Sequence, residues 1–526
     1  MIELKNVNFE YGSAEGAAGG IDEKVSNGSL CGVNLSVTEG EFLLLTGGSG
    51  CGKTTILRLI NGLIPNFFEG QLKGSVIIDG VDVSHAELYD TAKSVSTVFQ
   101  NPRSQFFNVD TTSELAFACE NQGMAEDEIL RRIDNTVSEL HLQPLMNRSL
   151  FDLSGGQKQK IACASVSVTG NKIILLDEPS ANLDLRTIDE LAGLLKKWKN
   201  EGKTIIVAEH RISYLWELAD RTVILSDGKI VRELLRAQMD KISEEELHGL
   251  GLRTNIGYKD LRVKPEDDKY SKSEDDKHSK PEDERAPMSP SGNTTMSPSG
   301  LPWGSSSSNF LTLQNFRYKY KNGYLALNIP QMQIPVGKIT AITGNNGDGK
   351  TTLLNCLCGL GRRSKGSLLY NGKNYNRLQR QKLIFLVMQD VNHQLFTESV
   401  LDEVLISQAE ENEEEARNIL ATLDLEQFAN RHPQSLSGGQ KQRVAVASAI
   451  ASGRDIMLFD EPTSGLDYTH MLQIGEILRS LKDQGKTVIV VTHDRELIKE
   501  CCDCEICLRD FNQINPVNPA EGEINA

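Results

Sequence analysis

The chain contains 526 residues, and because a packed domain usually holds roughly 100 to 200, we expect more than one domain. Acidic residues outnumber basic ones by 72 to 56, and the net charge of −16 disfavours a nucleic-acid partner, since it would repel phosphate backbones. The longest apolar runs, such as residues 173–176, are far shorter than the ~20 residues of a transmembrane helix, and ten cysteines are too sparse for a disulfide-rich secreted scaffold. With no signal-peptide pattern at the start, we expect a cytoplasmic protein.

The first recognisable unit in chain order is a buried strand, a glycine-rich loop and a helix. Residues 41–46 form the predicted strand and residues 55–61 the start of the helix. The glycines allow backbone N–H groups to face phosphates, Lys53 reaches the β- and γ-phosphates, and the Thr54 hydroxyl is a magnesium ligand. The predicted phosphate-binding residues are Gly47, Gly48, Ser49, Gly50, Cys51, Gly52, Lys53, Thr54 and Thr55.

A second apolar strand, residues 173–176, ends in the acid pair Asp177 and Glu178. Two buried carboxylates without a cation would be costly, so we expect Asp177 to hold magnesium and Glu178 to act as general base on the attacking water. His210 closes the next predicted strand, and Gln100 precedes the acid pair. We expect both side chains to converge on the γ-phosphate, with Gln100 also bound to the metal.

Low-complexity repeats occupy the middle of the chain. Residues 264–271 recur with changes at 272–279 and 280–287, and the segment lacks the apolar content needed to offset ordering entropy. We predict a disordered linker over 254–309, with packed domains at 1–253 and 310–526. A simple spacer is favoured over a binding segment.

The second domain repeats the motifs of the first. Leu153-Ser-Gly-Gly-Gln157 returns 283 positions later as Leu436-Ser-Gly-Gly-Gln440, which makes a chance glycine turn an unsatisfactory explanation of either loop. The second phosphate loop comprises Gly344, Asn345, Asn346, Gly347, Asp348, Gly349, Lys350, Thr351 and Thr352. Its expected metal ligands are Thr351, Gln389 and Asp460, and its expected catalytic residues are Glu461, His493 and Gln389.

These motifs together resemble the tandem ABC (ATP-binding cassette) ATPases over nearly all of both domains. The resemblance implies an α/β fold with two P-loop domains, each with a mainly parallel core sheet, an antiparallel β subdomain and a helical subdomain that carries the LSGGQ signature. It also implies ATP and Mg²⁺ as ligands. The two domains would pair within the chain, with each ATP held between them.

The resemblance implies further site residues. In the family the signature of one domain closes over nucleotide held by the other, so Lys53 and Glu178 would share a site with the second signature. The signature residues are Ser154, Gly155, Gly156 and Gln157, and Ser437, Gly438, Gly439 and Gln440. Tyr11 and Tyr318 lie where family members stack an aromatic ring on adenine, with Tyr320 as an alternative to Tyr318. Asp184 and Asp467 match the loop that communicates between domains.

The residues after Gln100 and after Gln389 indicate which group of ABC ATPases the chain resembles. A second glutamine lies five residues after Gln100 and after Gln389. An acid, Glu114 or Glu403, lies fourteen residues after the first glutamine of each copy. This pattern resembles the ATPases of energy-coupling-factor importers of vitamins and of cobalt or nickel ions. It implies a peripheral protein at the cytoplasmic face of the membrane, working with an integral coupling protein and a small substrate-binding membrane protein. We expect the two acids to flank an apolar groove that receives a partner helix bearing arginine.

Two other classes compete with this interpretation. Tandem cassette proteins of the translation-factor type bind ribosomes, but their inter-domain segment is typically basic and helical, whereas residues 264–285 contain nine acids, six bases and interrupting prolines. An ATPase of an ordinary ABC transporter has the same motifs. Near the C-terminus, residues 501–507 contain four cysteines, a possible zinc site, but the first domain builds the equivalent segment without cysteine, which favours buried thiols.

Overall fold

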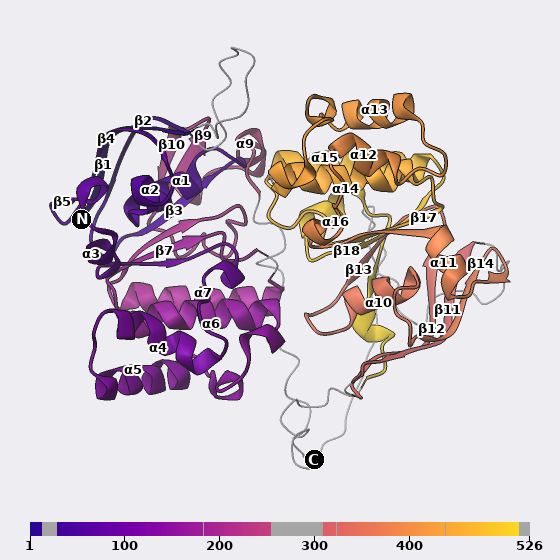
Figure 1. Cartoon of the computed structure of the whole chain (residues 1–526), viewed down its shortest axis with the longest axis horizontal. Helices are drawn as coiled ribbons and strands as arrows, with labels where there is room; N and C mark the ends of the chain where they lie inside the picture. Colours follow the sequence, from indigo (N-terminus) through magenta and orange to yellow (C-terminus); the bar gives the residue numbers. More distant parts are fainter. Residues whose placement is uncertain (13–28, 182, 254–308, 322, 437, 515–526) are drawn as a thin grey trace, which may run out of the picture.

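The structure is a computed structural model that describes residues 1–12, 29–181, 183–253, 309–321, 323–436 and 438–514. The predicted linker, residues 254–309, lies outside the described residues except for Asn309, and so does Ser437. Figure 1 shows the first half (up to residue 253) and the second half (from residue 309) side by side and inverted relative to one another. The helices α4 and α5 of the first half lie at one end of the molecule, and α12 and α13 of the second half lie at the other.

Each half contains a small antiparallel sheet that begins it. In the first half the strand order is β2 (Leu30–Val37), β1 (Ile2–Tyr11), β4 (Gly70–Ile78) and β5 (Val81–Asp82). In the second half it is β12 (Leu325–Pro335), β11 (Phe310–Lys319), β14 (Lys365–Tyr370) and β15 (Lys373–Asn374). Alternating buried residues along β1 and β11 turn one face of each sheet toward the core.

A mainly parallel sheet forms the centre of each half. In the first half the order is β10 (Lys229–Leu235), β9 (Arg221–Ser226), β3 (Phe42–Gly47), β8 (Thr204–Ala208), β7 (Ile173–Asp177) and β6 (Val95–Val98), and only β10 is antiparallel to its neighbour. In the second half it is β16 (Ile384–Val387), β17 (Ile456–Asp460), β18 (Thr487–Val491), β13 (Ile339–Thr343) and β19 (Cys504–Cys507). The strands β3, β7 and β8 are buried throughout, as expected of parallel strands covered on both faces.

Helices cover the sheets and build a separate helical part in each half. The first half has α1 (Lys53–Ile60), α2 (Leu63–Asn66), α3 (Leu88–Ala92), α4 (Thr111–Asn121), α5 (Glu126–Glu139), α6 (Gly155–Thr169), α7 (Leu185–Asn200), α8 (Arg236–Met239) and α9 (Glu244–Gly249). The second half has α10 (Lys350–Leu357), α11 (Arg377–Leu383), α12 (Val400–Leu405), α13 (Glu413–Thr422), α14 (Gly438–Ala451), α15 (Tyr468–Asp483) and α16 (Arg495–Cys501). The predicted fold class is confirmed.

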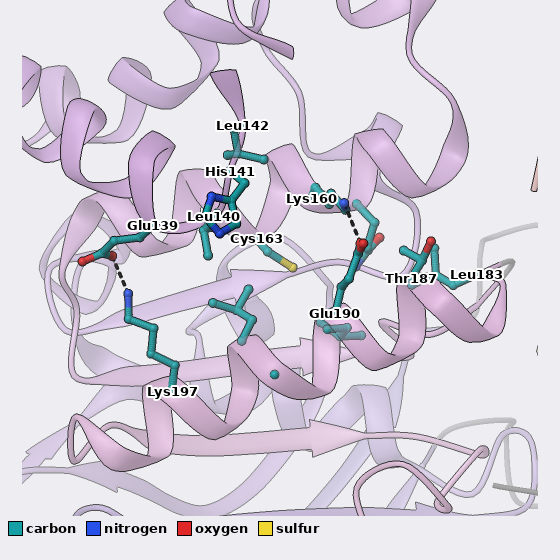
Figure 2. A pocket seen from close by; sticks show the side chains of 14 residues that line it. Glu139, Leu140, His141, Leu142, Lys160, Cys163, Leu183, Thr187, Glu190 and Lys197 are labelled. Carbon is teal, nitrogen blue, oxygen red and sulfur yellow. Dashed lines mark hydrogen bonds and ion pairs between the residues drawn. The ribbon is translucent and has the colours of Figure 1, made fainter. Parts of the chain in front are cut away.

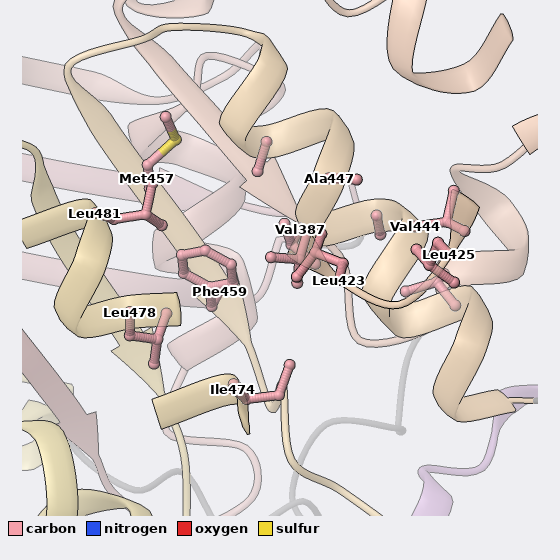
Figure 3. Close-up of a cluster of buried hydrophobic side chains, with 14 of the residues drawn as sticks. Val387, Leu423, Leu425, Val444, Ala447, Met457, Phe459, Ile474, Leu478 and Leu481 are labelled. Atoms are coloured by element: carbon pink, nitrogen blue, oxygen red, sulfur yellow. The ribbon is translucent and has the colours of Figure 1, made fainter. Parts of the chain in front are cut away.

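The apolar core of the second half joins its sheet to these helices. Figure 3 shows Val387 and Phe459 from the sheet among Ile474 and Leu478 of α15 and Val444 of α14, and all five side chains are buried. This packing continues from the core sheet into the helical part. The acid pair that ends β17 therefore projects from a rigid strand.

The structure also bears on the predicted membrane relationship and on the cysteine cluster near the C-terminus. No helix among the described residues is long and apolar enough to cross a membrane. Cys501 is buried at the end of α16, and Cys504 and Cys507 lie in β19. Within the described ranges there is no group of three or more His, Cys, Asp and Glu side chains placed to hold a metal ion.

Candidate functional site: two phosphate loops and their acids

Each phosphate loop lies between a central strand and a helix, as predicted. Gly52 precedes α1 with φ of 105°, and Gly349 precedes α10 with φ of 95°, a region that favours glycine. A Cβ on Gly52 would lie 2.5 Å from Leu30 Cδ2, and one on Gly349 would lie 2.7 Å from the Ala326 carbonyl oxygen. The backbone at these positions is therefore compatible only with glycine, which keeps the loop open toward a phosphate group.

The lysine of each loop is buried within it. The Lys53 ammonium donates to the carbonyl oxygens of Gly47 and Gly48, each at 3.0 Å. The Lys350 ammonium donates to the Gly344 carbonyl at 2.8 Å and to the Asn345 carbonyl at 2.9 Å. Both charges are thus held at the floor of the loop, where they can attract phosphate oxygens.

The first acid of each pair is suited to a metal ion. Asp177 ends β7 and accepts a hydrogen bond from the Thr54 hydroxyl at 3.0 Å, and burial raises the pKa of Asp177 to about 6. Burial also raises the pKa of Asp460, whose Oδ1 atom is buried with no hydrogen-bond partner among the described residues. A buried carboxylate oxygen beside a threonine hydroxyl is the hard-oxygen ligand set that Mg²⁺ prefers, so the residues fit this ion.

The second acid of each pair has a strained backbone. Glu178 has φ of 43° and Glu461 has φ of 49°, both in the left-handed region that non-glycine residues rarely adopt. Their N–H groups donate to the carbonyl oxygens of Ala208 and Val491, each at 2.8 Å. Such strain persists only where the surroundings impose it, and it is concentrated at functional sites.

Glu178 lies in a network of polar side chains. The Gln100 amide donates to Glu178 Oε2 at 2.6 Å, and His210 Nε2 lies 3.2 Å from Oε1. The same His210 nitrogen lies 3.3 Å from the Lys53 ammonium. Burial by itself would raise the pKa of Glu178, but its interactions with His210, Lys53 and Gln100 together outweigh burial, so the pKa of Glu178 lies below its ordinary value.

The equivalent carboxylate of the second half has weaker contacts. His493 Nε2 lies 3.6 Å from Glu461 Oε1, and the backbone N–H of His493 donates to Glu461 Oε2 at 3.4 Å. Burial raises the pKa of Glu461 to about 7 in spite of the nearby Arg211 and Lys350 charges. Burial also lowers the pKa of His493 to about 4. The two halves therefore hold the same residue types in different electrostatic states.

A cavity of about 280 Å³ in the second half collects most of the predicted residues. Its lining includes Lys350, Thr351, Gln389, Asp460 and Glu461. It also includes Tyr320 and Tyr324, whereas Tyr318 lines a neighbouring cleft with Leu360 and Arg362. The Tyr320 hydroxyl lies 2.8 Å from Thr352 Oγ1, and the Tyr11 hydroxyl lies 3.1 Å from Thr55 Oγ1. Tyr320 thus occupies the position equivalent to that of Tyr11, rather than the Tyr318 that the sequence favoured.

The halves contact each other at both phosphate loops. The Ser49 N–H donates to Asp467 Oδ2 at 2.7 Å, and the Asn346 N–H donates to Asp184 Oδ2 at 2.8 Å. Each bond joins the loop of one half to the aspartate of the other.

Of the signature residues, Ser154 caps α6 through a reciprocal pair of hydrogen bonds with Gln157, and Ser437 lies outside the described residues.

The sequence interpretation missed Arg253, the last described residue before the linker. Its guanidinium is buried in the second half, where it donates to Asp494 Oδ2 at 2.6 Å and to the Leu466 carbonyl at 2.9 Å. No motif contains it, and its position at the edge of the predicted linker gave no reason to single it out. Only its contacts identify it.

The expectation for Glu114 and Glu403 was wrong. Both side chains are buried, with exposed fractions of 4% and 3%. Glu114 Oε2 accepts from the N–H groups of Phe107 and Asn108 at 3.0 and 2.9 Å, and Glu403 Oε2 accepts from those of Phe396 and Thr397, each at 3.0 Å. The carboxylates therefore brace the loop after each motif glutamine, and neither lies open to an arginine of a partner.

A pocket of about 320 Å³ in the first half lies apart from the phosphate loop. Figure 2 shows this pocket between the end of α5 and the helices α6 and α7. Two ion pairs are formed by residues that line it, Lys160–Glu190 and Lys197–Glu139, each with 2.5 Å between nitrogen and oxygen. None of its lining residues belongs to the phosphate loop or the acid pair. It is thus separate from the candidate ATP site.

The fold and the two phosphate loops with their acid pairs define a tandem P-loop ATPase. The profile of the ABC transporter family matches residues 30–181 and 327–464. A putative ABC transporter ATP-binding protein of Treponema denticola is 41% identical over 506 residues, which cover 95% of this chain and 94% of that protein. One of Methanosarcina acetivorans is 31% identical over 519 residues, with 95% and 83% covered.

Solved structures show the same fold over both halves. The RNase-L inhibitor aligns with 96% of this chain and 87% of its own, with a TM-score of 0.57 and 19% identity. The archaeal ribosome recycling factor in complex with a ribosomal stalk protein aligns with 91% and 85%, with a TM-score of 0.56 and 20% identity. At this identity the likeness shows the fold alone.

The chain therefore belongs to the ABC transporter family of ATP-binding proteins. It is an ABC ATPase with two such domains, which pair with each other, bind ATP with Mg²⁺ and hydrolyse it to ADP and phosphate.

Proposed function

We propose that both ATP sites are catalytic and that each is built from both halves. Glu178 and Glu461 are the general bases: each accepts a proton from the water whose oxygen attacks the γ-phosphorus as the bond to ADP breaks. Thr54 with Asp177 and Thr351 with Asp460 would hold Mg²⁺, which would supply positive charge to the phosphate groups. The supporting observation is the strained left-handed backbone that both glutamates share at the end of a buried strand.

The remaining polar residues orient the water and the phosphate. In the first site Gln100 and His210 contact Glu178 directly, and Lys53 is within reach of the same histidine. Gln389, His493 and Lys350 take these roles in the second site. The signature of the opposite half completes each site, with Ser437 and Gly439 over the first nucleotide and Ser154 and Gly156 over the second. The paired bonds of Asp467 and Asp184 to the opposite loops support this arrangement.

We further propose that the chain powers uptake of a vitamin or metal ion through separate membrane proteins, as the resemblance to energy-coupling-factor ATPases implies. It would lie at the cytoplasmic face of the membrane, beneath an integral coupling protein and a small substrate-binding protein. The observation that supports a partner is the braced loop after each motif glutamine. Phe107 and Phe396 are 76% and 74% exposed on these loops, although the adjacent backbone is fixed by a buried glutamate.

These exposed rings are suited to an apolar segment of a partner. In the first half Phe107 stacks on Phe117 with ring centroids 5.0 Å apart, and Phe151 and Val109 are also largely exposed and belong to adjoining segments. Apolar side chains held out by a fixed backbone lose little entropy on binding, which favours an interface. Gln100, at the start of the same loop, contacts Glu178, so changes at the ATP site would alter the surface that a partner binds on this loop.

The test is affinity purification of the tagged chain from membranes in mild detergent. We expect one multi-spanning and one small hydrophobic protein to co-purify, and the variant Phe107→Ser with Phe396→Ser to lose both. The control is Leu235→Ser, which alters an exposed leucine on β10 away from these loops. Co-purification with ribosomes instead of membrane proteins, or capture that is unchanged in the phenylalanine variant, would contradict the proposal.

A further inference from the structure

An interdomain clasp, formed by His248, Gly251 and Arg253, joins the end of the first half to the second half. The Arg253 guanidinium is 5% exposed and uses all three of its nitrogens across the boundary between the halves. Nε donates to the Leu466 carbonyl at 3.1 Å and Nη2 to the same oxygen at 2.9 Å, while Nη1 forms the ion pair with Asp494 at 2.6 Å. A planar guanidinium is the side chain best able to make such a forked set of bonds.

The clasp holds the residues on both sides of Asp467. Arg253 bonds to the carbonyl of Leu466, and the N–H of Tyr468 donates to the Gly251 carbonyl at 3.3 Å. The His248 ring stacks on the Tyr468 ring with centroids 3.8 Å apart and planes 5° from parallel. Asp467, fixed from both directions, is the residue that accepts the hydrogen bond from the first phosphate loop.

Asp494 has bonds within the second half that do not depend on the clasp. It caps α16 by accepting from the Leu497 N–H at 3.2 Å, and it accepts from the Thr463 hydroxyl at 2.6 Å. His493 precedes Asp494 in the chain, so the capped start of α16 also holds His493 in position. Asp467 likewise caps α15 by accepting from the His470 backbone N–H at 2.9 Å, but the Leu466 carbonyl that precedes it accepts both Nε and Nη2 of Arg253.

The second half has no matching device in its described residues. After β19 it continues through a short turn to Ile514, without equivalents of β10, α8 and α9. Its Asn512 side chain instead donates to the carbonyls of Asp348 and Ala326 in its own half, at 3.0 and 3.2 Å. The turn around Asp184, which reaches the second phosphate loop, therefore has no counterpart of the clasp among the residues described.

We propose that Arg253 is a positioning residue that keeps Asp467 seated on the first phosphate loop without nucleotide, so that the two ATP sites are unequal. The first site is partly assembled before ATP binds. In the second site Asp184 makes the equivalent bond to the Asn346 N–H, but no clasp among the described residues holds the turn around it, so this bond opens more readily without nucleotide. This inference rests on the proposed roles of the two sites, but its first test does not depend on those roles.

Hydrogen exchange of the nucleotide-free, full-length protein tests the asymmetry directly. We expect the amides of residues 463–468 to exchange more slowly than those of the equivalent residues 180–185, by roughly tenfold or more, since exchange requires local opening. Arg253→Ala combined with Asp494→Asn removes the guanidinium together with the acid that pairs with it at 2.6 Å, while Glu496, 3.5 Å from the guanidinium, keeps its contact with His248, and asparagine still caps a helix. In this variant residues 463–468 should exchange faster than in the unaltered protein and approach the rate of residues 180–185, although the contacts of His248 and Gly251 with Tyr468 remain. Equal exchange in the unaltered protein, or unchanged protection in the variant, would overturn the inference.

Turnover at one site at a time provides the second test. With Glu461→Gln the remaining turnover reports the first site, and with Glu178→Gln it reports the second. Loss of the clasp should raise the KM for ATP at the first site by about tenfold and change the second site less, with kcat less affected than KM at either site. Arg232→Ala, which removes an ion pair with Glu246 within the first half, is the matched control and should change neither site.

The two experiments separate the role of Arg253 from the roles of the two glutamates. An equal or larger change of KM at the second site would overturn the role of Arg253. If the double variant Glu178→Gln with Glu461→Gln still turned over ATP at the normal rate, the proposed general bases would be wrong, but the exchange experiment would still decide the role of Arg253.

Discussion

Asp467 of the second half accepts a hydrogen bond from the backbone N–H of Ser49 in the first phosphate loop, with 2.7 Å between nitrogen and oxygen. Asp184 makes the equivalent bond to Asn346 at 2.8 Å. Residues more than 150 positions apart thus meet at each loop. The ATP sites are therefore a property of the paired halves, and changes in one half are expected to affect nucleotide held by the other.

The first prediction concerns the general bases. Replacing both Glu178 and Glu461 by glutamine should preserve ATP binding but reduce turnover by the order of 10² to 10⁴, the usual contribution of a positioned base. Glutamine keeps the size and hydrogen-bonding capacity of the side chain but cannot accept the proton. The check is steady-state phosphate release alongside equilibrium binding of ATP. Near-normal turnover in the double variant would refute the assignment.

The second prediction concerns magnesium. Asp177→Asn and Asp460→Asn should each raise the Mg²⁺ concentration needed for half-maximal turnover, by about tenfold or more, because one anionic oxygen ligand is lost. Removal of Mg²⁺ with a chelator should abolish turnover, and added Mg²⁺ should restore it. The measurement is a Mg²⁺ titration at saturating ATP. As a control, Asp240→Asn alters an exposed acid that forms an ion pair with Arg236 in α8, and it should leave the titration unchanged.

The third prediction concerns the buried glutamates of the two loops. Glu114→Lys should lower the free energy of unfolding by about 3 kcal/mol or more, because it leaves two N–H groups without an acceptor and buries a cation in place of an anion. Glu114→Gln should cost less, since its carbonyl oxygen can still accept. Chemical unfolding followed by circular dichroism provides the comparison. A stable, normally folded lysine variant would show that Glu114 does not brace the loop.

The fourth prediction concerns the linker, which lies outside the described residues. We expect it to supply effective concentration, typically millimolar for a flexible linker, and no specific contact. A protease site placed near Ser279 and then cut should leave a protein that hydrolyses ATP normally at high concentration and loses activity on dilution. Loss of activity that higher concentration fails to restore would show a specific role for the linker.

The sequence predicted the parts of the site that depend on local chemistry. The strands before Gly47 and before Asp177 were expected at 41–46 and 173–176, and the structure has them as Phe42–Gly47 and Ile173–Asp177. They were predictable because a buried parallel strand must be a continuous apolar run, and a loop that approaches phosphate must be rich in glycine. The duplication of both patterns then indicated two domains.

Only the tertiary structure showed which side chains contact the phosphate loops and the loops after the motif glutamines. The sequence favoured Tyr318, with Tyr320 as the alternative. However, β11 ends at Lys319, and a hydrogen bond from the Tyr320 N–H to the Tyr324 carbonyl and the contact of the Tyr320 hydroxyl with Thr352 Oγ1 place Tyr320 at the second phosphate loop. By sequence Glu114 resembles an exposed acid on a helix, but in the structure the loop that precedes α4 covers it and donates two N–H groups to it. Arg253 acquires its partners only when the second half packs against the first. Apolar periodicity and glycine content can be recognised from neighbouring residues. The environment of a charged side chain depends on how the chain folds, through a nearby loop at Glu114 and through segments distant in the chain at Arg253.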